Sequence, residues 1–147
     1  MKRTDALKPN PALESLSRLL GDWTISGGAS GRVTFKWMEG GFFMVQDIDM
    51  AGIHGIEFIG YDERSRTLRS DYFDSRGGKI ESTYYVSDTE HIILVDMPGI
   101  KGRFSGKFSD DGNRISGDWK WKKDEEQWEY RLVFTRLFSS NAVKAGK

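Results

Sequence analysis

The chain has 147 residues, with 22 basic and 22 acidic side chains and therefore no formal net charge. This length suits one domain with one core, and the neutral balance provides no single-signed field to attract nucleic acid or anionic lipid. Cysteine is absent, which excludes disulfides, thiolate metal sites and a cysteine nucleophile. No stretch approaches the roughly 18 apolar residues of a membrane-spanning helix. We therefore expect a cytoplasmic protein that binds neither nucleic acid nor membrane.

A short amphipathic helix is the first element predicted. Asn10 suits the N-cap and Pro11 the first helical position, and one apolar stripe follows. The stripe consists of Leu13, Leu16, Leu19 and Leu20. Gly21 is placed to stop the helix in a left-handed conformation. We expect the helix to cover one end of the fold, residues 11–138 to form the core of a single domain, and both tails to be loose.

Ten short segments of strand character fill the rest of the chain, separated by turn residues such as Gly, Asp and Asn. They are Asp22–Gly27, Arg32–Met38, Phe42–Met50, Ile53–Asp62, Leu68–Asp74, Lys79–Ser87, His91–Asp96, Gly102–Ser109, Arg114–Lys122 and Gln127–Leu137. One hairpin after another indicates an up-and-down meander, and closing it removes the exposed edges. The fold class predicted is therefore all-β, an antiparallel barrel of about ten strands.

The opening Gly21-Asp22-Trp23 resembles the Gly-x-Trp of the calycins, the superfamily of lipocalins and fatty-acid-binding proteins. Arg136, in the run VFTRL, resembles the calycin Arg that packs across that Trp at the closed end. The runs WMEGGFFMVQD, GIEFIGYD and YFDSRGG are similar to an uncharacterised bacterial family of lipocalin-like barrels. This resemblance covers roughly residues 13–137 and implies a barrel with a cavity, but no established activity.

Trp23 and Arg136 have two interpretations. Arg136 could hold an anion inside a cavity, or it could form a cation–π and hydrogen-bonded latch that joins the first strand to the last. We favour the latch.

Haem-binding barrels of the nitrobindin type also open with Gly-x-Trp, and a His late in the chain holds their iron. Here the histidines are His54 and His91, and neither lies late enough. The glycine spacing also departs from that motif, and two histidines without cysteine are a poor metal set. We expect no cofactor and no metal.

Large side chains on one face of several strands suggest an apolar pocket with a few polar groups. The residues predicted to line it are Trp37, Met44, Gln46, Tyr72, Tyr84, Trp119 and Tyr130. The alternative is a barrel that these side chains fill completely.

Ionisable groups decide whether such a pocket could do chemistry. Alternation with Phe42, Met44 and Gln46 on the inner face places Asp47 and Asp49 outside. In the following strand, either His54, Ile56 and Phe58 point inward, or Glu57, Ile59 and Tyr61 do; we favour an outward Glu57. His91 follows the turn residues Asp88-Thr89-Glu90, and we expect it in solvent.

These observations predict the binding of a small, largely apolar or aromatic molecule in a barrel cavity. One alternative is a cofactor-free isomerase or lyase that uses Tyr hydroxyls and Glu57. Another is a structural barrel that acts as a homodimer.

Overall fold

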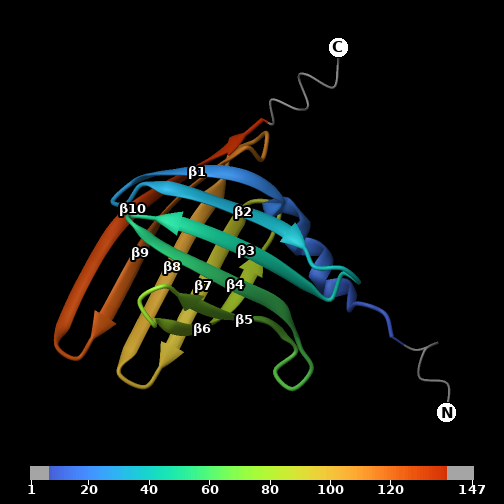
Figure 1. Cartoon of the computed structure of the whole chain (residues 1–147), viewed down its shortest axis with the longest axis horizontal. Coiled ribbons are helices and arrows are strands. Elements are labelled where there is room, and N and C mark those ends of the chain that lie inside the picture. The colour runs from blue at the N-terminus through green and yellow to red at the C-terminus, as the bar shows by residue number, and fades with distance from the viewer. Residues whose placement is uncertain (1–6, 139–147) are drawn as a thin grey trace.

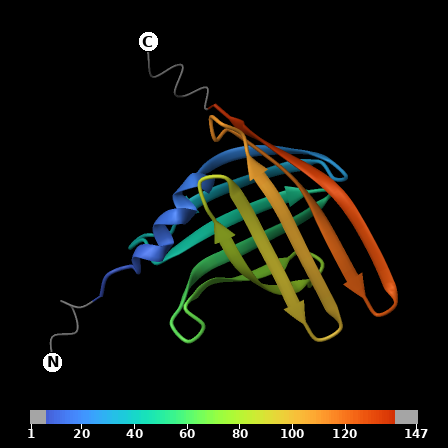
Figure 2. The same cartoon turned by 180° about the vertical axis from the view of Figure 1, so that it is seen from behind.

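The computed structural model describes residues 7–138 and shows a closed antiparallel β-barrel (Figures 1 and 2). Its elements in chain order are the helix η1 (Pro11–Leu19) and the strands β1 (Gly21–Gly27), β2 (Gly31–Trp37), β3 (Phe43–Met50), β4 (Ile53–Asp62), β5 (Thr67–Asp74), β6 (Lys79–Val86), β7 (Glu90–Met97), β8 (Ile100–Phe108), β9 (Arg114–Lys123) and β10 (Glu126–Leu137). Most of the two tails predicted to be loose, residues 1–6 and 139–147, lies outside the described residues.

Each strand pairs with its neighbours in the sequence, and β1 pairs with β10 to close the barrel. The predicted up-and-down barrel of ten strands is therefore confirmed. Closure pairs every strand with two neighbours, but the β6–β7 ladder covers only Thr83–Val86 of β6 and His91–Leu94 of β7. No helix among residues 7–138 is long and apolar enough to cross a membrane.

The N-terminal helix lies at one end of the barrel (Figures 1 and 2). It is a 3₁₀ helix, and the Asn10 side chain caps it by accepting the N–H of Ala12 at 2.8 Å. Leu13, Leu16 and Leu19 are buried in the core. The helix ends at Leu19, and Gly21 instead opens β1 with a φ of +113°.

The main core lies inside the barrel and includes the buried leucines of η1. Besides the three leucines of η1, it contains Trp23, Ile25, Val33, Phe35, Met44, Ile59, Leu68, Tyr84, Phe104, Ile115 and Leu132. These side chains come from most strands at the positions that alternation turns inward. Each fully buried aliphatic or aromatic side chain contributes about 2 kcal/mol of transfer free energy.

Alternation along β3 corrects one expectation and bears out another. Phe42, expected on the inner face with Met44, precedes the strand and is 37% exposed. Met44 and Gln46 are buried, whereas Asp47 and Asp49 are exposed on the outer face as expected.

Candidate functional site

The barrel contains a cavity of about 370 Å³. Its lining reaches Ala29 and Ala51, which lie in or beside the β1–β2 and β3–β4 turns, at the end of the barrel away from η1. The aliphatic part of the wall includes Ile48, Met50, Ile53, Ile80, Ile93 and Val95. The aromatic part includes Tyr72, Tyr84, Trp119, Trp121, Tyr130 and Phe134. This space is large enough for a small organic molecule and is mostly apolar.

Five of the seven residues predicted to line the pocket lie in this wall: Gln46, Tyr72, Tyr84, Trp119 and Tyr130. The other two, Trp37 and Met44, lie outside it. Met44 is fully buried in the core at the helix end, and Trp37 packs against that core. The leucines of η1 fill this end of the barrel, so an inward position there does not face the cavity.

The aromatic wall continues beyond the predicted residues. Trp121 stacks on Trp119 with 4.6 Å between ring centroids, and its Nε1 donates to the Tyr130 hydroxyl at 3.3 Å. Trp128, which is 42% exposed and lies outside the cavity lining, stacks on Trp121 with 6.3 Å between ring centroids. Trp121 was missed as a lining residue, although it shares its strand face with Trp119 and alternation alone could have identified it.

Glu57 lies inside the barrel, which corrects the orientation favoured from the sequence. It sits midway along β4, between Gln46 of β3 and Tyr72 of β5 in the strand register, and is 6% exposed. His54 and Ile56 point outward instead. The strand register decides this, because β4 carries apolar residues on both faces and its own pattern is ambiguous.

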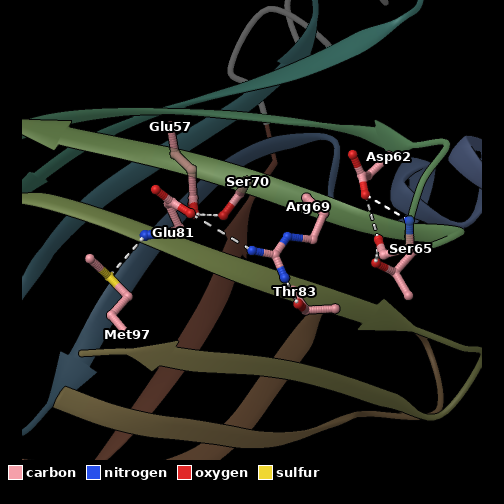
Figure 3. Close-up of polar contacts among 9 residues, drawn as sticks. Glu57, Asp62, Ser65, Arg69, Ser70, Glu81, Thr83 and Met97 are labelled. Atoms are coloured by element: carbon pink, nitrogen blue, oxygen red, sulfur yellow. Dashed lines mark hydrogen bonds and ion pairs between the residues drawn. The ribbon is translucent and has the colours of Figure 1, made fainter. Parts of the chain in front are cut away.

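Two hydroxyl groups hold the Glu57 carboxyl group. The Ser70 hydroxyl donates to Oε2 and the Tyr84 hydroxyl donates to Oε1, each at 2.7 Å. Figure 3 shows the bond from Ser70, while the neighbouring Arg69 side chain bonds to Thr83 on the outer face of the barrel. Ser70 could not be identified from the sequence, because serine is common on both faces of a strand.

Burial raises the pKa of the Glu57 carboxyl group above its ordinary value of 4.5, and the two hydrogen bonds offset this only in part. Burial and the adjacent carboxyl group also raise the pKa of the Tyr84 hydroxyl well above 10.0. The site therefore holds a carboxyl group that resists ionisation unless a cation or further hydrogen-bond donors approach it.

Replacing Glu57 with Gln should change how stability depends on pH. The folded state retains the Glu57 proton at pH values where the unfolded chain has lost it. The free energy of unfolding of the wild type, relative to Glu57→Gln, should therefore fall as pH rises above about 4.5 and level off above the folded pKa. Urea denaturation of both proteins at several pH values measures this difference.

The groups that face Glu57 are Gln46, Ser70, Tyr72 and Tyr84, and repulsion from the Asp71 carboxylate adds a smaller increase to the pKa of Glu57. As a control, Glu129→Gln removes an exposed carboxylate of β10. The control makes the same chemical change on the outer surface, away from the cavity. A difference between Glu57→Gln and the wild type that does not change with pH would contradict the assignment of a raised pKa.

His91 is buried, which corrects the expectation that it lies in solvent. Its ring is 3% exposed and lies 5.3 Å from the Tyr84 ring and 5.7 Å from the Phe104 ring. The residue opposite it on β8 is Gly106, where a Cβ atom would lie 2.6 Å from the Phe104 ring, so this glycine makes room for one of the two rings that pack against His91. Burial lowers the pKa of His91 to about 4, so the ring is neutral near pH 7.

Trp23 and Arg136 face each other across the β1–β10 seam. The guanidinium carbon lies 4.1 Å from the centre of the indole ring. The same guanidinium donates to the carbonyl oxygens of Leu20, Arg18 (2.9 Å) and Gly112 (3.3 Å), and to the Asn113 side chain at 3.0 Å. Arg136 is absent from the cavity lining, so this geometry supports the latch rather than an Arg136 that holds an anion inside the cavity.

The cavity offers a bound molecule a few polar side chains within a mostly apolar wall. Its wall contains the side chains of Gln46, Glu57, Ser82, Tyr84 and His91. These groups can hold one polar group of a bound molecule, and Glu57 can exchange a proton with it. Within residues 7–138, no three His, Cys, Asp or Glu side chains gather closely enough to hold a metal ion.

No family model matches the sequence, and no curated protein matches it. Among solved structures, the chain is similar to a Schistosoma mansoni fatty acid binding protein in complex with arachidonic acid, with a TM-score of 0.56 and 16% sequence identity. The match covers 84% of this chain and 99% of that chain. At this identity the likeness shows the fold, which is calycin-like as the sequence resemblance implied. Membership of the uncharacterised bacterial family stays a prediction.

Proposed function

We propose that the protein binds a small, largely apolar or aromatic molecule inside the barrel. The observation that carries this proposal is the cavity of about 370 Å³ with its aromatic and aliphatic wall. Gln46, Tyr72, Tyr84, Trp119 and Tyr130 are the proposed contacts. Each apolar contact adds roughly 25 cal/mol per Å² of surface removed from water, before the costs of association.

The structural neighbour supports the same class of ligand. Its structure contains arachidonic acid, a molecule with a long apolar chain, and its barrel has the same calycin-like fold. At least one other protein of this fold therefore binds a ligand with a long apolar chain. The wall residues of the present chain, rather than the likeness, determine which ligand fits.

Blocking the cavity should abolish binding. Ile80 of β6 lines the cavity, and Ile80→Trp would extend an indole ring into the space that a ligand needs. We expect the affinity for N-phenylnaphthylamine, an uncharged aromatic dye, to fall at least about tenfold, because its enclosed apolar surface is lost. Dye fluorescence in a titration measures the affinity.

The matched control is Glu81→Trp, the neighbouring residue of β6, whose side chain is exposed on the outer face. This variant adds the same ring without entering the cavity, and it should bind the dye as the wild type does. Equal affinities for all three proteins, or no binding by the wild type, would contradict the proposed function. Circular dichroism spectra confirm beforehand that both variants fold.

A further inference from the structure

The polar groups of the cavity point to a particular class of ligand head group. Glu57 accepts one hydrogen bond on each carboxyl oxygen, from the Ser70 hydroxyl on Oε2 and from the Tyr84 hydroxyl on Oε1. A carboxylate offers about four acceptor positions, so each oxygen can accept one further donor. Gln46 and Ser82, which are 7% and 4% exposed, also line the cavity, and no hydrogen bond of their side chains occurs within residues 7–138.

The ionisable side chains of Asp, Glu, Lys or Arg type in the described wall of the cavity are all acidic. The acidic residues of its wall are Glu57 and Asp74, and the wall contains no Lys or Arg among the described residues. Asp74 lies at the end of the barrel away from η1, where its Oδ2 accepts a hydrogen bond from the Tyr72 hydroxyl at 2.9 Å. His91 brings no positive charge near pH 7, because its pKa is lowered to about 4. A negative ligand group would therefore find no cation inside the barrel and would lie beside a carboxyl group.

Resting on the proposed function, we infer that the cavity selects molecules with an apolar body and a protonated amine, whose N–H groups bond to Glu57, and that it rejects fatty acids. A cationic amine supplies both the hydrogen-bond donors and the positive charge that the buried carboxyl group lacks. The rings of Trp119, Trp121 and Tyr130 enclose the apolar body and also favour a cation over an anion.

Three probes with one apolar chain and different head groups test this inference: decylamine, decanol and decanoic acid. Near pH 7 the amine is a cation, the alcohol is neutral and the acid is an anion. We expect titration calorimetry to show decylamine binding at least about tenfold tighter than decanol, and decanoic acid binding weakest. Glu57→Gln should reduce the affinity for decylamine to about that for decanol.

Glu129→Gln is the control variant, because it removes one exposed carboxylate from the outer face and should keep the wild-type ranking. Decanol or decanoic acid binding the wild type as tightly as decylamine would overturn the inference and leave the proposed function intact. An unchanged decylamine affinity in Glu57→Gln would do the same. If none of the three probes binds, the proposed function itself fails. The wild-type ranking decides the question even if Glu57→Gln does not fold.

Discussion

Arg136→Met should reduce the free energy of unfolding by about 3 kcal/mol. The change removes a guanidinium that lies over the Trp23 ring and donates to backbone carbonyl oxygens of Leu20, Arg18 and Gly112. Those carbonyl groups join the end of η1 and the β8–β9 turn to the barrel seam, and methionine offers them no donor. Urea denaturation followed by tryptophan fluorescence measures the loss.

Arg131→Met on the same strand is the matched control. Arg131 pairs with Asp118 at 3.1 Å on the outer face, where the two side chains are 58% and 48% exposed. An exposed pair of this kind contributes less than about 1 kcal/mol. A loss for Arg136→Met as small as that for Arg131→Met would contradict a latch that holds the barrel closed.

Acid should destabilise the protein through His91. As pH falls below 6.5, the unfolded chain binds a proton at His91, whereas the folded state stays neutral until about pH 4. Stability is therefore lost as pH falls between these values, by up to about 3 kcal/mol. His91→Phe should remove this loss, because phenylalanine fits between the Tyr84 and Phe104 rings and takes no proton. The substitution removes a hydrogen bond between the imidazole and the Tyr85 backbone, whereas the buried Nδ1 atom has no hydrogen-bond partner within the described residues.

Thermal denaturation at several pH values measures the difference between His91→Phe and the wild type. Other groups near His91 titrate as well, above all Glu57, which bonds to Tyr84. The raised pKa of Glu57 stabilises the folded state as pH falls, so its effect has the opposite sign to that of His91. The difference between the two proteins isolates His91. His54→Phe is the control, because that imidazole is exposed on the outer face beside Asp47, and it should keep the acid loss. A wild-type acid loss retained in His91→Phe would refute this explanation.

The fold was predictable from the sequence because it depends on local patterns. Turn residues occur at regular spacing, and several strands alternate between apolar and polar side chains, as Arg114–Lys123 does. The contact between Trp23 and Arg136 was predictable from the resemblance, which pairs these two residues. The same alternation predicted part of the cavity wall. It identifies which face of a strand a side chain lies on, but not how far along the barrel that side chain lies. Trp37 and Met44 show this, because the leucines of η1 occupy their end of the barrel.

The polar centre of the cavity could not be predicted in the same way. Glu57 lies on a strand with apolar residues on both faces, so its orientation follows from the pairing of β4 with β3 and β5. His91 follows a polar turn that is typical of exposed chain, yet the rings of Tyr84 and Phe104 pack against it and bury it. Both positions depend on residues far away in the sequence, and only the assembled barrel brings these together.

A crystal structure of the protein with N-phenylnaphthylamine tests the central claim most directly. We predict one dye molecule inside the barrel, in contact with Trp119 and Tyr130 and ending near Glu57. A dye molecule bound only on the outer face, or an interior filled by side chains with no space for it, would contradict the claim that this barrel is a container.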